Sequence, residues 1–177
     1  TLVTPQIRSR FVAIEPGPMP DVHSRDLGHE IFLVLEGNAE FEIEGERDVV
    51  GPGQMCVALT NQTHAVRSAG PEPAIMYLSV TPHIQPTHTY WDNQGNRKPH
   101  RFAGPEVYDS TIDASVSDVK VVDRYVEALA AAVEAGQTAA VAHEDLAGRL
   151  KVAMAEGNAV DIERTRNALW DSVSGLY

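Results

Sequence analysis

Two histidines and one glutamate, His23, Glu30 and His64, are the side chains whose types and spacing best suit metal binding. Two imidazoles and one carboxylate bind a first-row transition metal and leave positions open for other ligands. Arg25 lies between two of them in the sequence, and an arginine stays protonated and donates no lone pair. What this set can bind therefore depends on Arg25. The set falls within two segments, Gly17-x5-His23-x-Arg25-x4-Glu30-x6-Gly37 and Gly53-x5-Leu59-x-Asn61-x2-His64-x3-Ser68.

The segments that must position these side chains are short runs rich in β-branched and aromatic residues. We predict strands at residues 11–14, 30–35, 39–43, 54–59, 64–67 and 75–80, because Gly and Pro residues separate these runs. Residues 39–44 alternate apolar and acidic side chains, which is typical of a strand with one face on a core and one in water. Many short strands joined by regular turns predict a mainly β fold, either a sandwich or a barrel.

The two segments resemble the two motifs of the cupin superfamily, which read G-x5-H-x-H-x3,4-E-x6-G and G-x5-P-x-G-x2-H-x3-N. The residues from Glu30 to Gly37 read EIFLVLEG, close to the family's E-x-F-x-V-L-E-G. The 15 residues between Gly37 and Gly53 (38–52) match the short spacing of compact cupins. The resemblance covers about residues 10–80. It implies a small single-domain cupin of the cupin_2-like type, a double-stranded β-helix (jelly-roll) barrel that is often dimeric.

The resemblance also implies a set of metal ligands. The family site takes two histidines and one glutamate from the first motif and one histidine from the second. His23, Glu30 and His64 match three of these positions, whereas Arg25 occupies the place of the second histidine. The second motif has three further changes, which affect turn residues rather than ligands. They are Leu59, Asn61 and Ser68 in place of Pro, Gly and Asn.

Three interpretations of Arg25 are open. In the first, a metal binds to His23, Glu30 and His64, and Arg25 anchors an anionic group of the substrate through its bidentate fork. In the second, another histidine completes the ligand set. In the third, no metal binds, and Arg25 forms a buried or half-buried ion pair with Glu30 in a metal-free binding pocket. The candidate histidines of the second interpretation are His29, His83, His88 and His100.

The sequence pattern changes after the predicted strands. Residues 82–104 lack periodicity and are expected to be a loop that trails the barrel, so that residues 1–104 form one domain. Residues 105–177 are expected to form a helical extension of about three helices, over residues 117–136, 138–157 and 158–173. Ser117 is the predicted N-cap of the first helix, and Gly136 is predicted to end it. The apolar stripes of these helices are typical of packing, either in dimerisation or as a lid over the barrel.

Composition excludes several classes of function. The net charge of −11 and the pI near 5.0 disfavour binding to nucleic acid, and no polybasic patch is present for anionic membranes. No apolar run approaches the roughly 20 residues needed to cross a bilayer. The single cysteine, Cys56, rules out an intrachain disulfide. We expect a cytoplasmic protein that forms a homodimer and has a small molecule as its partner.

These observations lead to two hypotheses of function. In the first, the barrel is a metal-dependent enzyme that acts on a small anionic molecule, with iron, manganese, nickel, zinc or cobalt as a Lewis acid or oxygen-activating centre. Cupins include dioxygenases, isomerases and lyases, and the fold does not choose among them. In the alternative, the barrel is a non-catalytic or metal-free cupin that binds or senses a small molecule, and Arg25 replaces a metal ligand.

Overall fold

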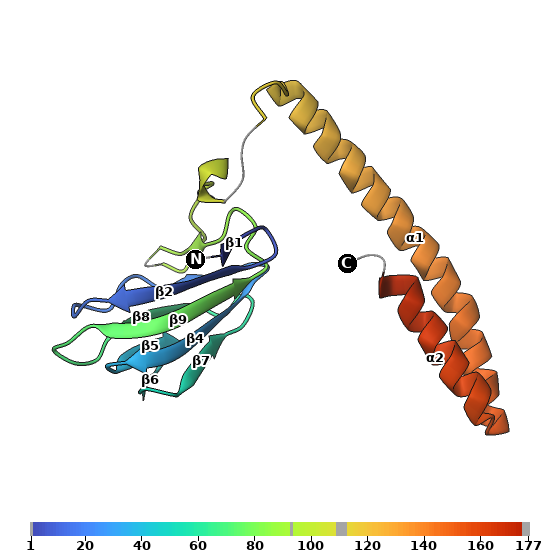
Figure 1. The fold of residues 1–177 in the computed structure, drawn as a ribbon, viewed down its shortest axis with the longest axis horizontal. Helices are drawn as coiled ribbons and strands as arrows, with labels where there is room; N and C mark the ends of the chain where they lie inside the picture. The colour runs from blue at the N-terminus through green and yellow to red at the C-terminus, as the bar shows by residue number, and fades with distance from the viewer. Residues whose placement is uncertain (1, 93, 109–112, 175–177) are drawn as a thin grey trace. The chain divides into compact units, whose positions relative to one another are not determined.

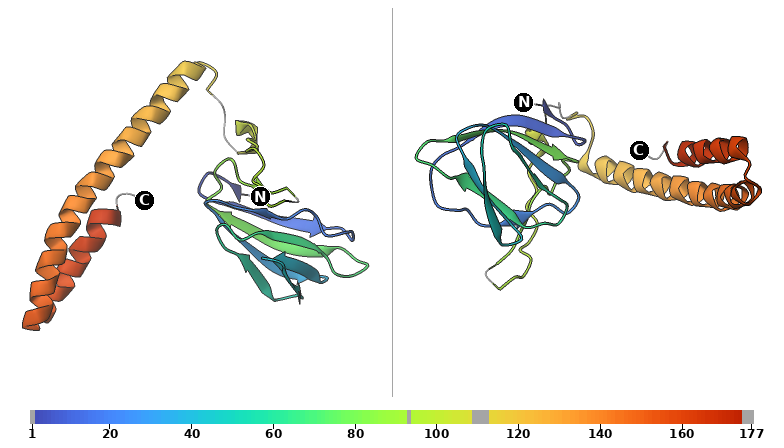
Figure 2. Two further views of the ribbon diagram at one scale, coloured as in Figure 1. Left: turned by 180° about the vertical axis from the view of Figure 1, so that it is seen from behind. Right: turned by 90° about the horizontal axis from the view of Figure 1, so that it is seen from below.

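The computed structural model describes residues 2–92, 94–108 and 113–174. The chain divides into two compact units, Thr1–Ile112 and Asp113–Tyr177. The first unit is built mainly from strands and the second from helices (Figures 1 and 2). This division falls later in the chain than the boundary predicted after residue 104.

The first unit contains two antiparallel sheets of five strands each (Figure 1). The strand order is β1-β2-β9-β4-β7 in the first sheet and β10-β3-β8-β5-β6 in the second. The strands are β1 Leu2–Val3, β2 Arg8–Ile14, β3 His23–Ser24, β4 His29–Glu36, β5 Ala39–Ile43, β6 Glu46–Val50, β7 Met55–Ala58, β8 His64–Ser68, β9 Ala74–Thr81 and β10 Thr89–Tyr90. The six predicted strands correspond to β2, β4, β5, β7, β8 and β9, and the predicted jelly-roll barrel is confirmed.

The core lies between the two sheets and is formed by the inward face of each strand. Phe32 and Val34 on β4 and Met76 on β9 are almost completely buried, while the alternate residues of β4 are more exposed. Phe32 meets Phe41 on β5 of the second sheet, and their ring centroids are 5.0 Å apart. Successive side chains of a strand point to opposite faces, so this alternation is the expected pattern for strands with one buried face.

The inward faces become polar at one end of the barrel, which we call the mouth. On β2, Arg8 and Arg10 lie opposite Val80 and Leu78, two residues of the core, and therefore share their inward face. The same register places Glu30 of β4 opposite Val80. Charged side chains thus gather beside an apolar core. The mouth consists of Arg8, Arg10, His23, Arg25, Glu30 and His64.

Residues 82–104, predicted to be a trailing loop, contribute to the barrel, so that prediction is wrong in part. β10 pairs with β3, with Thr89 opposite Ser24 and Tyr90 opposite His23. The segment therefore extends the second sheet next to the mouth. Strands of two residues carry no periodicity that a sequence pattern can reveal, which explains why β1, β3 and β10 were not predicted.

Two helices, not three, form the second unit: α1 Asp118–Glu156 and α2 Ala159–Ser174. Ser117 is the N-cap of α1, as predicted. The predicted helix end at Gly136 is wrong, because this glycine lies inside α1 and its φ is not positive. Helix-forming alanines surround it and offset its cost of about 1 kcal/mol relative to alanine. α1 ends instead at Gly157, which has a φ of 66° and donates its N–H to carbonyls of the last turn.

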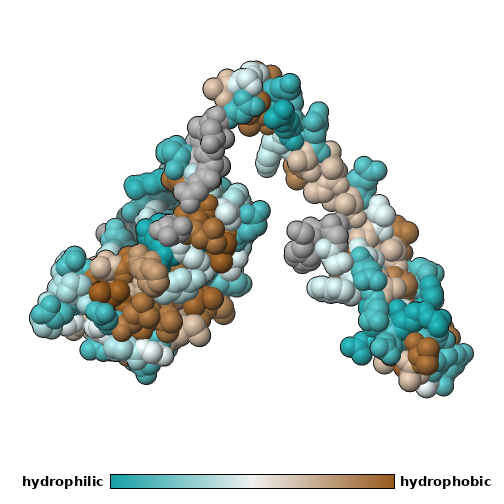
Figure 3. Space-filling model, in the orientation of Figure 1, coloured by the Kyte–Doolittle hydropathy of each residue, from teal (hydrophilic) through white to brown (hydrophobic). Residues whose placement is uncertain are grey.

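α1 and α2 pack against each other but bury few side chains, namely Ala139, Ala153 and Thr165. None of the described helices is long and apolar enough to cross a membrane. Five apolar residues of α1, which we call the α1 stripe, are 53–71% exposed. They follow one another at spacings of three, four, three and four residues. Figure 3 shows hydrophobic residues at the surface of both units. The α1 stripe consists of Val119, Val122, Val126, Leu129 and Val133.

Candidate metal centre and ligand pocket

Three strands bring the predicted metal ligands together at the mouth. His23 on β3 lies directly opposite His64 on β8, and Glu30 reaches them from β4 in the other sheet. One ligand atom of each residue lies within 4.8 Å of the others. The Oε2 atom of Glu30 is 3.0 Å from Nε2 of His64 and 4.0 Å from Nε2 of His23. This convergence produces the two-histidine, one-carboxylate set that the spacing suggested.

Both ring nitrogens of His64 lie close to an oxygen atom. The Nδ1 atom of His64 lies 3.0 Å from the carbonyl oxygen of Gln62, and Nε2 lies 3.0 Å from Oε2 of Glu30. Both oxygens only accept hydrogen bonds, whereas a neutral imidazole has a single N–H to donate. If Nδ1–H donates to Gln62, the Nε2 lone pair faces a carboxylate. In that tautomer, a metal ion bound by Nε2 and Oε2 would satisfy both atoms.

Arg25 is buried and holds Glu30 with two hydrogen bonds. Its Nε atom donates to Oε2 of Glu30 at 2.5 Å, and its Nη2 atom donates to Oε1 at 3.0 Å. A further Nη1–H donates to the carbonyl oxygen of Thr87 at 2.9 Å. The side chain of Arg25 is only 4% exposed. The structure therefore contains the buried ion pair that the third interpretation expects.

The mouth keeps Glu30 ionised and His23 neutral. Burial opposes the ionisation of Glu30, but hydrogen bonds from His64 and Arg25 outweigh it and hold the pKa of Glu30 well below its usual range. Burial lowers the pKa of His23 to about 4, and the neighbouring His64 adds to this effect. An anionic carboxylate and a neutral imidazole are the forms in which these groups bind a metal.

The donor set fits a metal with three protein ligands but not with four. A carboxylate has about four lone-pair positions, and Arg25 occupies two of those of Glu30. Glu30 therefore keeps acceptor capacity for a metal. The carbonyl oxygen of Gln62 orients the His64 ring in the way that outer hydrogen bonds orient metal-binding imidazoles. The guanidinium of Arg25 lies on the same carboxylate and adds a positive charge.

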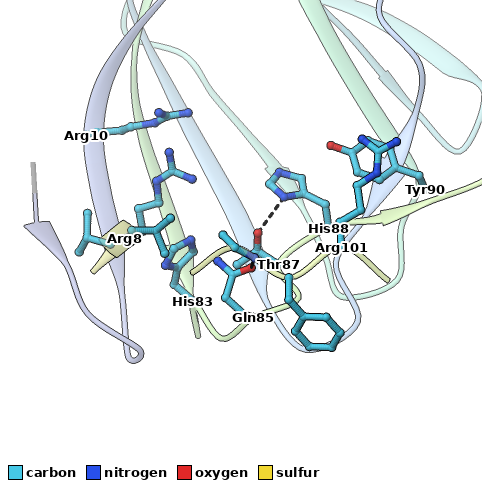
Figure 4. Close-up of a pocket in the computed structure, with 12 residues that line it drawn as sticks. Arg8, Arg10, His83, Gln85, Thr87, His88, Tyr90 and Arg101 are labelled. Carbon is cyan, nitrogen blue, oxygen red and sulfur yellow. Dashed lines mark hydrogen bonds between the residues drawn. The ribbon is translucent and has the colours of Figure 1, made fainter. Parts of the chain in front are cut away.

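None of the other candidate histidines joins the converging ligand atoms. His88 comes closest, because its ring centroid lies 4.8 Å from that of His23. Its Nε2 atom accepts from Nη2 of Arg25 at 3.1 Å, and its Nδ1–H therefore donates to Oγ1 of Thr87 at 2.8 Å (Figure 4). His29 is exposed and bonds to Thr60 on the outside of the barrel. Two others lie elsewhere, His83 in the adjoining pocket and His100 at the surface.

A pocket of about 460 Å³ adjoins the mouth (Figure 4). This is within the range of small-molecule sites. His88 links it to the metal ligands, because His88 lines the pocket and also contacts Arg25. The sequence motifs did not single out Arg8, Arg10 or Arg101 of this pocket. The one signal for Arg8 and Arg10 in the sequence is the period of two within residues 8–14. Counting back from Ile14 in steps of two reaches Arg10 and Arg8, which therefore lie on the inward face of β2. The charged and aromatic lining residues are Arg8, Arg10, His83, His88, Tyr90 and Arg101.

Comparisons with known proteins found a matching family model and several similar solved structures. The family model described as "Cupin domain" matches residues 10–81. No curated protein matches the chain. Among solved structures, a protein with a double-stranded β-helix domain from Klebsiella pneumoniae is 27% identical, with 46% of this chain and 71% of that chain covered and a TM-score of 0.43. KdgF from Halomonas sp. is 25% identical, with 47% and 74% covered and a TM-score of 0.42. The first unit thus contains a region, residues 10–81, that matches the cupin domain model.

Proposed function

We propose that the mouth binds a divalent transition metal through His23, Glu30 and His64, and that the protein acts on a small anionic molecule there. One observation carries this proposal. The Nε2 atom of His64 and the Oε2 atom of Glu30 lie 3.0 Å apart while Nδ1 of His64 faces a carbonyl oxygen. A metal ion would satisfy both of these atoms, and the approach of His23 offers a third ligand.

The metal, when bound, supplies Lewis-acid or oxygen-activating chemistry of the oxidoreductase, isomerase or lyase classes. The residues of the chain have separate tasks. Arg25 holds Glu30 in one orientation through two hydrogen bonds. An arginine has five N–H donors, and Arg25 uses four of them on Glu30, Thr87 and His88. We propose that its remaining Nη1–H contacts an anionic group of the substrate.

The charges of the mouth favour an anionic substrate. Arg8, Arg10 and Arg25 provide three positive charges, and Glu30 provides one negative charge. A metal ion adds to this excess. In a chain with a net charge of −11, the mouth is therefore a local positive region. Such a cleft attracts and concentrates anions.

A second candidate function is a metal-free pocket that binds or senses a small anion. The ion pair of Arg25 with Glu30 supports it, because this pair balances the carboxylate without a metal. In this case a second proton on His64 is the cation beside Glu30. Both candidate functions involve an anionic ligand. They differ in whether a metal ion lies beside Glu30.

Metal content distinguishes the two candidates. We would reload the purified chain with manganese, iron, cobalt, nickel or zinc in turn, dialyse it and measure bound metal by plasma emission. We expect about one ion per chain in the wild type and none in His64→Ala. His29→Ala is the matched control, because His29 lies on the opposite face of β4 from Glu30. The metal proposal fails if the wild type holds no more metal than His64→Ala.

Arg25→His sharpens this test because it restores the family's second histidine. If the site already binds metal, the substitution tightens binding without changing the number of ions per chain. If the wild type is metal-free, the substitution creates binding where none existed. The second result would assign the metal-free function to the wild type.

We also propose that the chain forms a homodimer through the α1 stripe. Apolar residues that alternate at spacings of three and four are typical of the seam of a coiled coil. The five stripe residues are 53–71% exposed, so the helical unit alone leaves this seam uncovered. A second copy of α1 presents the same stripe and would cover it.

Sedimentation equilibrium tests the dimer. We expect the wild type to be dimeric and Leu129→Asp to be monomeric, because the substitution places a charge in the seam. Val141→Asp is the control, since Val141 is 71% exposed on the same helix but lies outside the stripe. A monomeric wild type would contradict the proposal.

A further inference from the structure

Two arginines of the pocket lack counter-ions. Arg8 and Arg10 extend from β2 toward the cavity that His88 borders from the other side (Figure 4). Across the part of the chain that the structure describes, neither guanidinium forms an ion pair, and the buried Nε atom of Arg10 has no hydrogen-bond partner. Both arginines are half-buried, and an unpaired charge that is partly withdrawn from water costs stability. These arginines are therefore better explained by a ligand than by the fold.

His83 adds a third unpartnered group to the same pocket. Its backbone is held on both sides, because its N–H donates to the carbonyl oxygen of Pro5 at 2.9 Å and its carbonyl accepts from the hydroxyl of Tyr108 at 2.8 Å. The residue is 2% exposed, yet its Nδ1 atom has no hydrogen-bond partner. Burial lowers the pKa of His83 to about 4, and the charge of Arg8 adds to this effect. The neutral ring can donate one hydrogen bond into the pocket.

We propose that Arg8, Arg10 and His83 form a subsite for a small doubly charged oxyanion, a dicarboxylate or a phosphate monoester. The charge follows from the mouth itself. Arg8 and Arg10 bring two positive charges to this side of the pocket, and Glu30, which is paired with Arg25, does not offset them. Guanidinium groups bind carboxylate and phosphate oxygens through parallel hydrogen bonds. This inference rests on the proposed anionic substrate but does not require the metal.

The subsite lies next to the metal ligands rather than apart from them. His88 lines the pocket and accepts a hydrogen bond from Arg25, which in turn holds Glu30. An anion held by Arg8 and Arg10 would therefore place the rest of the molecule near His88. Arg101 stands at the other side of the pocket, with its guanidinium carbon 5.5 Å from the ring centroid of Tyr90.

The test compares matched probes and variants. Titration calorimetry and thermal melting would use succinate, butyrate and inorganic phosphate on the full chain. We expect succinate or phosphate to bind at least about tenfold more tightly than butyrate, and Arg10→Met to lose this preference. Arg8→Met repeats the test. Arg67→Met is the control, because Arg67 pairs with Glu40 away from the pocket.

Stability without ligand provides a second readout. Arg10→Met removes an unpaired charge, so its melting temperature should equal or exceed that of the wild type. A lower melting temperature together with unchanged succinate and phosphate binding would assign Arg10 a structural role and overturn the subsite.

Metal content of the same samples separates this inference from the proposed function. A chain that binds metal but neither succinate nor phosphate better than butyrate overturns the subsite alone. A chain that holds no metal after reloading but binds either dianion more tightly than butyrate supports the subsite and rejects the metal proposal. Tighter binding of succinate would identify a dicarboxylate as the ligand, and tighter binding of inorganic phosphate would identify a phosphate monoester.

Discussion

The two units of the chain differ in which side chains they bury. The barrel buries its apolar residues between two sheets and also buries Arg25, Glu30 and His64 at one end of that core. Among its described residues, the helical unit buries two alanines and one threonine and does not itself cover the α1 stripe. Buried charges cost free energy, so their presence indicates a site, whereas an exposed apolar seam indicates assembly. The comparison supports our proposals of ligand binding in the barrel and association through the helices.

Removing Glu30 should have the largest effect on stability. Glu30→Gln leaves Arg25 with an unbalanced buried charge, and we expect a loss of roughly 3–5 kcal/mol in the free energy of unfolding. Urea denaturation measures this loss. The control from the helical unit is Asp145→Asn, which breaks an exposed pair with Arg149. Equal effects in both units would contradict the contrast between them.

Acid should unfold the barrel before the helices. The pKa of His23 is lowered in the folded state to about 4, from an ordinary value of 6.5. The unfolded chain therefore takes up this proton first, and stability is lost as the pH falls from 6.5 through about 4. His23 alone accounts for up to about 3 kcal/mol. Circular dichroism between pH 7 and pH 4 checks this expectation: loss of the strand signal with retention of the helical signal agrees, and simultaneous loss disagrees.

A turn glycine of the barrel should be far less tolerant than the glycine inside α1. Gly37 has a φ of 71°, and an added Cβ would lie 2.5 Å from the carbonyl oxygen of Pro73. We expect Gly37→Ala to destabilise the barrel by about 2 kcal/mol or more, because strain and a backbone clash combine. Chemical denaturation gives the value. An unchanged midpoint would show that the turn can rearrange.

The smallest expected effect has the opposite sign. Gly136 lies inside α1, and an added Cβ would meet no atom within 4 Å. Gly136→Ala should therefore stabilise α1 by about 0.5–1 kcal/mol. Thermal melting followed by the helical signal measures this gain. Gly157→Ala is the contrasting variant, because its φ of 66° makes alanine unfavourable there.

Spacing along the chain predicted the barrel and the three converging side chains. It worked because His23, Glu30 and His64 lie on strands, or at strand ends, whose lengths and turns fix where each side chain points. It left the role of Arg25 open, since no pattern tells whether a guanidinium faces a carboxylate or a ligand. The structure pairs it with Glu30.

The pocket and the continuation of α1 through Gly136 could not be predicted, for different reasons. Arg8 and Arg10 become pocket residues only because β9 lies beside β2, a pairing between segments about 70 residues apart in the chain. β10 is too short to show a period. A glycine ends a helix when it adopts a positive φ, which the sequence does not reveal. Gly136 does not adopt a positive φ, so α1 continues through it.

Anomalous diffraction would show whether the mouth holds the metal that we propose. Crystals of the full chain, reloaded with the metal it retains best, would be measured at that metal's absorption edge. We expect one peak bonded to His23, Glu30 and His64, with Arg25 still on Glu30. No peak at the mouth, together with an unchanged contact between His64 and Glu30, would contradict the metal centre and assign the cation to a second proton on His64.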